Sequence, residues 1–336
     1  MPDELEFSVI LPVCHGGVFL RKSLASLCGL DFPPDRFEVL VVGADGDSES
    51  YDAVAGEAAS AALAISYIAC GSTNRSARLN AACAAARGRF LAFADDDCVF
   101  LPEWLRRLSA VLHTTGDIGI AGGCDEIVHG GSAFAVALDR VFNTFIGSGG
   151  IRRGAGVRVG KYYPKLWNMT VPRETALHVA LKSEDGLPQV FKESLSVHED
   201  VDLAHRVSGA GKKIVYAPEV RIRHYRDTTF RSFVSRNFAM ARTCRSLGIH
   251  RFPHTVLAVF ALSALSLSIA SLFYQRLWVL LLGFVGIYTI LLLAAAVDGL
   301  RKTRNLTASL MIPPLLVSLH FARGLGYLFP LRERGG

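Results

Sequence analysis

The sequence predicts an α/β protein with a doubly wound, mostly parallel sheet, followed by a C-terminal transmembrane helical region. Over the first 125 residues, short apolar runs alternate with helix-like segments, which is typical of strands joined by helical crossovers. After residue 250 come two long apolar stretches without a single charge. A cluster of acidic residues closes one of the buried runs, at the sheet edge where folds of this kind bind ligands.

Five apolar runs are expected to form strands of the sheet. They cover residues 7–12, 37–42, 64–68, 90–94 and 118–120. A helix is expected after the first run, because Leu20, Leu24 and Leu27 recur on one helical face. An Ala-rich helix is expected over 74–87, and Pro102 is expected at the first position of the helix after the fourth strand.

The middle of the chain predicts a more irregular succession of elements. A helix is expected near 173–182 and another begins at Glu199. Two short strands, 213–216 and 220–223, are expected on either side of Pro218. Residues 228–247 read as an amphipathic helix rich in Phe and Arg, which favours a position at a membrane surface.

The C-terminal region predicts a membrane hairpin. Segments 255–274 and 277–297 are uncharged, and only Gln275 and Arg276 separate them. Basic residues flank the pair, so the positive-inside bias places residues 1–250 and 298–305 in the cytoplasm of a multi-pass membrane protein. The shorter stretch 306–322 contains Pro313 and Pro314 and reads as a third span, a re-entrant piece or an interfacial helix.

These observations predict three parts. Residues 1–226 form the cytosolic domain, 227–252 an amphipathic interfacial helix or linker, and 253–336 a membrane region with two or three hydrophobic helices. The acidic N-terminus runs straight into a strand, so no signal peptide is expected. Seven cysteines without a paired spacing fit reduced thiols. The net charge of +6 gathers around the apolar segments, which favours a membrane partner and not nucleic acid.

Asp95, Asp96 and Asp97 follow the buried run 90–94. In an extended segment Asp95 and Asp97 would share one face. Carboxylates suit Mg²⁺ or Mn²⁺, which also bind substrate phosphates, so this pattern indicates chemistry on a metal-bound diphosphate. Asp96 would then point elsewhere, toward a nucleoside or sugar. The alternative is a strand-end turn capped by Asp.

A second acidic group, Glu199, Asp200 and Asp202, opens a predicted helix. An isolated acidic pair suits a general base. The alternative is charge that stabilises a helix N-terminus without any chemistry. His224 follows a basic strand; a neutral imidazole can bind a metal, although a lone histidine is more often a packed or surface residue.

Taken in order, these motifs resemble those of the family 2 glycosyltransferases, which have the GT-A fold. The resemblance covers about residues 7–230. It rests on Ser8–Pro12, Val41-Val42 with Asp45-Gly46, Arg78-Leu79-Asn80 with Ala86–Phe90, Asp95–Asp97 with Pro102 and Trp104, Asn168-Met169 with Arg173, Glu199–Arg206 with Gly211, and Tyr216–Glu219 with His224.

The resemblance implies an inverting transfer of a sugar from a nucleotide-sugar donor, with Mn²⁺ or Mg²⁺ as cofactor. It implies metal binding by Asp95, Asp97 and His224, and deprotonation of the acceptor hydroxyl by Asp200. A nucleotide site would include Pro12, Asp45, Asn80, Asp95 and Asp96. An in-line displacement further implies that Asp200 lies across the cleft from Asp97.

Two departures from the family pattern stand out. The second strand ends in Gly43-Ala44-Asp45 where two adjacent Asp are usual, and the Gln-x-x-Arg-Trp motif of processive synthases is missing. With its C-terminal spans, the chain is similar to the bacterial enzymes that extend lipid-linked exopolysaccharide units, such as the succinoglycan type. This implies a lipid-linked (polyprenyl) or glycan acceptor. The glycine- and arginine-rich segment 147–163 is either a loop that closes over such substrates or a solvated surface loop.

The residues leave other functions open. A catalytically silent membrane scaffold with the same fold is the main alternative. A nucleotidyltransferase would need a basic glycine-rich loop after the first strand, but no Lys or Arg occurs between Pro12 and Arg21. A small transporter would need charge within the spans, and the two clear spans have none.

Overall fold

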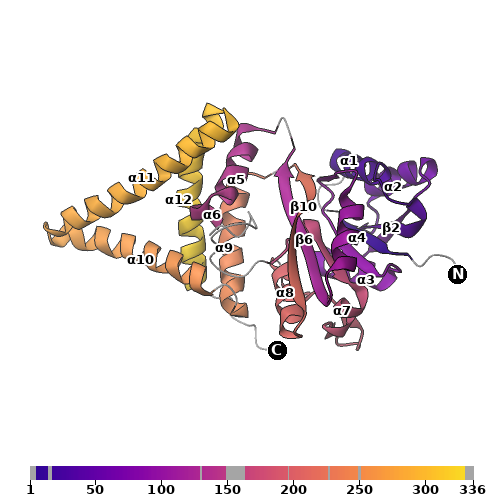
Figure 1. The fold of residues 1–336 in the computed structure, drawn as a ribbon. Coiled ribbons are helices and arrows are strands. Elements are labelled where there is room, and N and C mark those ends of the chain that lie inside the picture. The colour runs from indigo at the N-terminus through magenta and orange to yellow at the C-terminus, as the bar shows by residue number, and fades with distance from the viewer. Residues whose placement is uncertain are drawn as a thin grey trace. The chain divides into compact units, whose positions relative to one another are not determined.

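The computed structural model describes residues 5–13, 17–128, 131–148, 163–195, 197–225, 228–248 and 251–329, with only the backbone of 251–253. The chain divides into two compact units, Met1–Val128 with Tyr162–Tyr225 and His129–Lys161 with Arg226–Gly336. Figure 1 shows the elements of both. We call them the sheet unit and the helical unit. The functional boundaries expected at 226 and 252 stay predictions.

The sheet unit is built on eight strands in the order β3-β2-β1-β4-β7-β6-β10-β5. The bounds are β1 Phe7–Pro12, β2 Phe37–Ala44, β3 Ala64–Cys70, β4 Phe90–Phe93, β5 Cys98–Phe100, β6 Ile118–Ile127, β7 Met169–Pro172 and β10 Lys213–His224. The β3-β2-β1-β4 and β6-β10 pairs run parallel, while β7 and β5 pair antiparallel. The short pair of β8 (Leu181–Lys182) and β9 (Pro188–Gln189) lies apart. The mostly parallel α/β fold predicted from the sequence is confirmed.

Helices cover the sheet and complete its core. They are α1 Gly17–Cys28, η1 Pro34–Arg36, α2 Ser48–Ser60, α3 Arg75–Ala85, α4 Trp104–Thr114, η3 Leu166–Asn168, α7 Arg173–His178 and α8 Glu199–Gly209. Every residue of β1 is buried, because helices lie on both faces of a parallel sheet. The predicted α1 face, Leu20, Leu24 and Leu27, is fully buried against it.

Two local expectations are wrong. Pro102 lies in a turn before α4, whose helical residues begin at Trp104, where Trp104 N–H donates to Leu101 O at 2.9 Å. The two short strands expected around Pro218 form one strand, β10, with a shift of register between Tyr216 and Arg221. The irregular segment lies so close to β6 that a Cβ at Gly123 would fall 1.7 Å from Val220 O.

The family-like residues Ala86–Phe90 lie at the amino-terminal ends of the strands, opposite the predicted site. Buried Glu38 accepts hydrogen bonds from Ser8 Oγ at 2.7 Å and from the Arg87 side chain at 2.9 and 2.6 Å. Gly88 passes so close to β1 that a Cβ would fall 2.4 Å from Ser8 N. This part of the motif therefore holds strands together.

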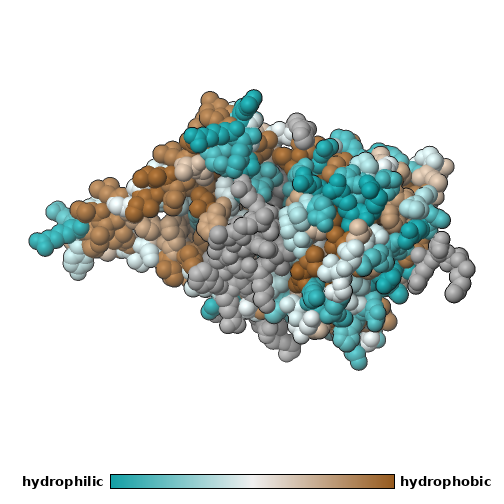
Figure 2. All heavy atoms as spheres, viewed as in Figure 1, coloured by the Kyte–Doolittle hydropathy of each residue, from teal (hydrophilic) through white to brown (hydrophobic). Residues whose placement is uncertain are grey.

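The helical unit contains α5 Ala133–Asn143, α6 Phe145–Ser148, α9 Phe230–Leu247, α10 Arg251–Phe273, α11 Leu277–Thr303 and α12 Leu306–Leu328. The last three are long and apolar enough to cross a membrane. Figure 1 shows α10 and α11 diverging from a tight turn, with α12 joining their far ends. Figure 2 shows apolar surface along both arms and hydrophilic atoms at the turn. The predicted hairpin and the presence of a third long apolar helix are thus observed.

Candidate active site

The acidic run lies just past β4, at the carboxyl-terminal edge of the parallel strands. Asp95, Asp96 and Asp97 are all buried, at 7%, 0% and 2% exposure. The chain turns here, since Cys98 N–H donates to Asp95 O at 3.2 Å, so the extended geometry expected for Asp95 and Asp97 is wrong. The turn sends their carboxylates to different partners. Asp96 is fixed through its backbone, whose oxygen accepts from Ser23 Oγ at 2.7 Å.

Asp97 meets His224, which is 127 residues later in the chain. His224 ends β10, and its Nε2 lies 2.9 Å from Asp97 Oδ2 and 2.8 Å from Oδ1. The antiparallel pairing of β10 with β5 aligns His224 with Cys98 and so fixes this contact. The Trp167 ring packs on the imidazole, with centroids 5.2 Å apart. Strand pairing therefore brings together two of the residues predicted to bind metal.

The donor set around this pair fits a divalent cation. The ligand atoms of Asp97, His224 and Cys98 lie within 4.8 Å of one another. Among the described residues, the buried His224 Nδ1 makes no hydrogen bond, and Asp125 Oδ2 lies 4.0 Å from it. Burial raises the pKa of the Cys98 thiol well above its usual range, and the neighbouring carboxylates raise it further, so the thiol stays protonated. A carboxylate and an imidazole, completed by phosphate oxygens, suit Mn²⁺ or Mg²⁺.

Arg75 joins the first acidic group to the second. It lies at the start of α3, where its Nη2 forms an ion pair with Asp95 and its Nε lies 3.5 Å from Glu199 Oε1. Burial raises the pKa of Asp95, and Arg75 opposes this rise. Burial likewise raises the pKa of Glu199, with Arg75 acting against it and Asp200 adding to it. Acidic residues a hundred positions apart thus share one guanidinium.

Asp200 lies in the first turn of α8 and is buried at 6% exposure. Its Oδ2 lies 3.3 Å from Lys165 Nζ, and its Oδ1 accepts from Val201 N–H at 2.8 Å. Before the helix, His198 adopts a left-handed backbone with φ of 67°. Such a conformation is strained for a residue other than glycine and is common at functional sites. The backbone thus enters α8 through a constrained turn that places Glu199 and Asp200 beside Arg75 and Lys165.

Asp202, the third acidic residue of this group, has a structural role. Its Oδ2 accepts from Arg206 Nε at 2.9 Å and Nη2 at 2.8 Å. Arg206 also donates to the backbone oxygens of Val179 and Val190. The pair therefore ties α8 to the segment that carries β8 and β9.

Asn80 holds the chain that leads into α8. Its Oδ1 accepts from Phe191 N–H at 2.8 Å, and its Nδ2 donates to Phe191 O and Glu193 Oε1, both at 2.9 Å. Asn74 caps α3 and donates to Glu193 O at 2.6 Å. The side-chain amides of Asn80 in α3 and of its cap residue Asn74 thus both form hydrogen bonds with residues 191–193. The assignment of Asn80 to the nucleotide site stays a prediction.

Pro12 ends β1 and Asp45 directly follows β2, at the same edge as the acidic turn. Pro12 is buried, whereas Asp45 is exposed. The departure at Gly43 has a structural cause, because a Cβ there would fall 2.3 Å from the Tyr67 hydroxyl. That hydroxyl donates to Ala44 O at 2.9 Å. Tyr67 thus occupies the space beside the end of β2. Asp45 is the first acidic residue after this strand.

The sequence did not predict four residues that lie at the site: Arg75, Asp125, Lys165 and Trp167. Arg75 directly follows the helix cap Asn74, so it lies at the same sheet edge as the other site residues. Lys165 and Trp167 come from an irregular segment whose position no periodicity indicates. The candidate loop 147–163 falls largely on 149–162, outside the described residues.

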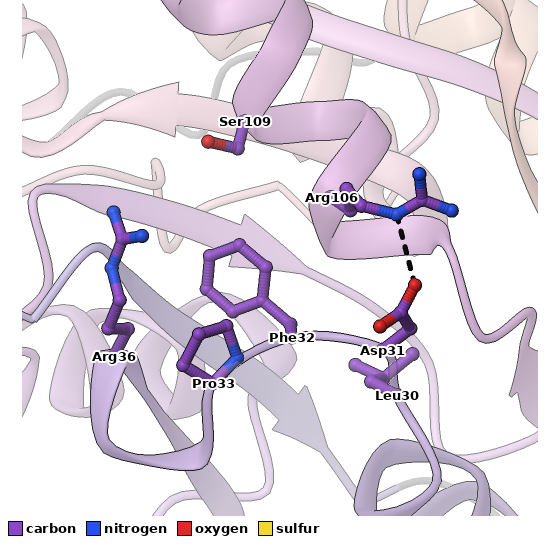
Figure 3. A pocket seen from close by; sticks show the side chains of 7 residues that line it. All are labelled: Leu30, Asp31, Phe32, Pro33, Arg36, Arg106 and Ser109. Carbon is purple, nitrogen blue, oxygen red and sulfur yellow. Dashed lines mark ion pairs between the residues drawn. The ribbon is translucent and has the colours of Figure 1, made fainter.

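A hollow of about 590 Å³ lies elsewhere in the sheet unit, near the amino-terminal ends of β1 and β2. Figure 3 shows its lining, with Phe32 and Pro33 at the base and Arg106 paired with Asp31 across a 3.1 Å contact. Both charged side chains are largely exposed to solvent. The hollow contains no predicted site residue and no acidic cluster, so we do not place the chemistry there.

Fold and acidic residues together define a class of sugar-transferring proteins with a parallel sheet and a carboxylate-rich edge. Residues 2–243 match the family model described as "Glycosyltransferase like family 2". The chain belongs to this family, as its motifs predicted.

A curated relative and a solved structure are among the known proteins that resemble the chain. Succinoglycan biosynthesis protein ExoM of Rhizobium meliloti (strain 1021) is 33% identical over 125 residues, which is 36% of this chain and only 40% of that relative's length. Mannosyltransferase PcManGT from Pyrobaculum calidifontis, solved with GDP-Man and Mn²⁺, aligns with a TM-score of 0.55 at 15% identity. That alignment covers 96% of this chain and 87% of the other and shows a shared fold, as expected for the GT-A type.

Proposed function

We propose that the chain is an inverting, metal-dependent glycosyltransferase. It moves a sugar from a nucleotide-sugar donor to a lipid-linked or polysaccharide acceptor at the cytoplasmic face of a bacterial inner membrane. The observation that carries the proposal is the buried contact of Asp97 with His224. Asp95 lies two residues before Asp97, and Arg75 links it to Glu199, the neighbour of Asp200 in the chain. A structural ion pair alone does not require so many carboxylates in one buried place.

Asp97 and His224 would hold Mn²⁺ or Mg²⁺, with Asp95 nearby. When bound, the cation offsets the negative charge that develops on the leaving diphosphate. Asp95 and Asp96, with Pro12, Asp45 and Asn80, would contact the nucleotide. The PcManGT relative, whose structure contains GDP-Man and Mn²⁺, supports a nucleotide-sugar donor and a divalent cation.

Asp200 would act as the general base. Its carboxylate accepts the proton of the acceptor hydroxyl as that oxygen attacks the anomeric carbon. The bond from this carbon to the diphosphate oxygen breaks, and its electron pair leaves with the nucleotide. One displacement from the opposite face inverts the anomeric configuration. Lys165, 3.3 Å away, positions the carboxylate for this step.

The acceptor proposal rests on the helical unit and on one relative. The apolar hairpin of α10 and α11 would keep the enzyme at the surface where lipid-linked sugars are found. Arginines before the hairpin and Arg301, Lys302 and Arg304 after it favour the cytoplasmic side for both flanks. The name of ExoM refers to succinoglycan biosynthesis, which supports an exopolysaccharide intermediate as acceptor.

The test separates donor binding from sugar transfer. Full-length protein is titrated with GDP-, UDP- and dTDP-sugars in the presence of Mn²⁺, and transfer of labelled sugar to a bacterial lipid extract is followed. Asp200→Asn should keep donor affinity and lose transfer by roughly 10²- to 10⁴-fold, the usual contribution of a general base. Asp117→Asn, an exposed and distant change of the same kind, is the matched control.

Two results would contradict the proposal. Near-normal transfer by Asp200→Asn would remove the base assignment. Donor binding by the native chain, without transfer or slow donor hydrolysis under any condition, would favour the silent scaffold instead.

A further inference from the structure

The three apolar helices of the helical unit differ in how much protein covers them. In α10 and α11 only 17% and 11% of the most apolar window is buried, whereas in α12 the value is 50%. All three are long enough to cross a bilayer, so length does not distinguish them. The elements that pack against each helix within the helical unit do distinguish them.

One neighbour of α12 is α9, a helix that carries arginines. Arg323 Nε donates to Asn237 Oδ1 at 3.0 Å, and Arg242 Nε donates to Phe329 O at 2.9 Å. A Cβ at Gly326 would fall 2.4 Å from Phe238 O, so the two backbones touch. Three arginines of α9 are exposed, Arg231, Arg236 and Arg245, and the last of them also lies 5.2 Å over the Tyr327 ring of α12. Exposed arginines are costly in the hydrocarbon core, so α9 belongs at the membrane surface, and α12 lies at the same depth.

A second side of α12 is covered by α5 and α6. His320 Nε2 lies 2.7 Å from Ile146 O, and Arg323 Nη1 donates to Gly147 O at 3.2 Å. Leu315, Leu316 and Leu319 pack in a shared core with apolar residues of α5. His320 and Arg323 of α12 thus have their hydrogen-bond partners within the protein.

The ends of α12 give an independent argument. Near its start, Ile312 lies against Gly299 at the end of α11, where a Cβ would fall 2.3 Å from the Ile312 side chain. Near its end, Gly324 lies against Leu257 in the first turns of α10, where a Cβ would fall 2.5 Å from Leu257 O. The start of α10 and the end of α11 are the two ends of one hairpin opposite the Gln275–Arg276 turn. If the hairpin crosses the membrane, both ends of α12 lie on one face.

We propose that α12 runs along the membrane surface as a crossbar and that only α10 and α11 cross. The remaining side of α12 exposes an apolar stripe at helical spacing, formed by Leu306, Leu310, Pro314 and Leu325. This stripe fits the boundary between headgroups and acyl chains of the lipid surface that holds the hairpin. Phe329 therefore lies on the same face as Arg301, and the turn at Gln275 lies on the other. The proposal does not depend on the catalytic one.

Single cysteines in a cysteine-free full-length chain test the topology. Arg301→Cys, Phe329→Cys and Gln275→Cys replace exposed side chains. Bacterial cells that express each variant are treated with a membrane-impermeant maleimide before and after permeabilisation. Only Gln275→Cys should label in intact cells, and the other two should label after permeabilisation.

A second measurement keeps the native cysteines. Fluorescent protein fused after Gly336 should fluoresce, and alkaline phosphatase fused there should be inactive, because the C-terminus stays in the cytoplasm. Labelling of Phe329→Cys together with Gln275→Cys in intact cells, or an active phosphatase fusion, would overturn the proposal by showing that α12 crosses. Labelling of all three positions from one face would overturn it by showing that the hairpin does not cross.

Discussion

At the scale of single residues, several buried carboxylates of the site share a few basic side chains. Asp95 and Glu199 share Arg75, Asp200 contacts Lys165, and Asp97 contacts His224. Burying an ionised carboxylate is costly unless a partner offsets the lost hydration. The raised pKa of Asp95 and of Glu199 shows that the offset is incomplete. Such a site is prepared for additional positive charge.

Glu199→Gln should stabilise the chain at neutral pH. Because burial raises the folded-state pKa of Glu199, the unfolded chain ionises this group first as the pH rises, and native stability falls above the unfolded-state value. Glutamine keeps the shape without this loss. Thermal unfolding in detergent should show a higher melting temperature for Glu199→Gln at pH 7, with the difference shrinking toward pH 4. A lower melting temperature for Glu199→Gln than for the native chain at pH 7 would mean that the Arg75 contact outweighs burial.

The sequence indicated the acidic half of the site and not the basic half. Runs of acidic residues after a buried strand and at a helix start are conspicuous, because ionised carboxylates are costly to bury without a partner. Arg75 and Lys165 are ordinary surface-type residues until the fold turns them toward buried acids. The contact between Asp97 and His224 depends on the pairing of strands, because the two residues are 127 positions apart in the chain. No local sequence pattern indicates such a pairing.

At the scale of elements, close backbone approach decides which glycines the fold requires. Gly88→Ala should destabilise the sheet unit by about 1–3 kcal/mol or more, since the new methyl group would meet Ser8 N and the Phe7 backbone in fully packed strands. Gly56→Ala is the control, because a Cβ there meets nothing within 4 Å, and it should add about 0.5–1 kcal/mol inside α2. Thermal unfolding of both variants measures the difference. Equal melting temperatures would mean that β1 yields to the methyl group.

The elements that the sequence predicted are those with strong local patterns. The buried strands β1, β2 and β4 and the apolar helices α10 and α11 follow from predominantly apolar runs. The three-residue strand β5 exists only through its pairing with β10. The third apolar stretch was expected to stop before Arg323, yet α12 continues to Leu328, because Asn237 and Gly147 O accept from that guanidinium.

At the scale of the whole molecule, the family match and the membrane helices cover different parts of the chain. The match ends at residue 243, and the three long apolar helices all follow it. The fold class and the presence of the hairpin were predictable because composition changes abruptly after residue 250. Whether α12 crosses was not predictable, because its depth depends on helices that are remote in sequence.

We propose that Asp97 and His224 form a metal site that binds a nucleoside diphosphate. Calorimetric titration of Mn²⁺ into the full-length chain, with the nucleoside diphosphate that binds, tests it most directly. The native chain and the Asp117→Asn control should bind one Mn²⁺ with equal affinity. Asp97→Asn and His224→Ala should each weaken binding at least roughly tenfold, since each removes a ligand of the ion. Unchanged Mn²⁺ affinity in Asp97→Asn would contradict the account.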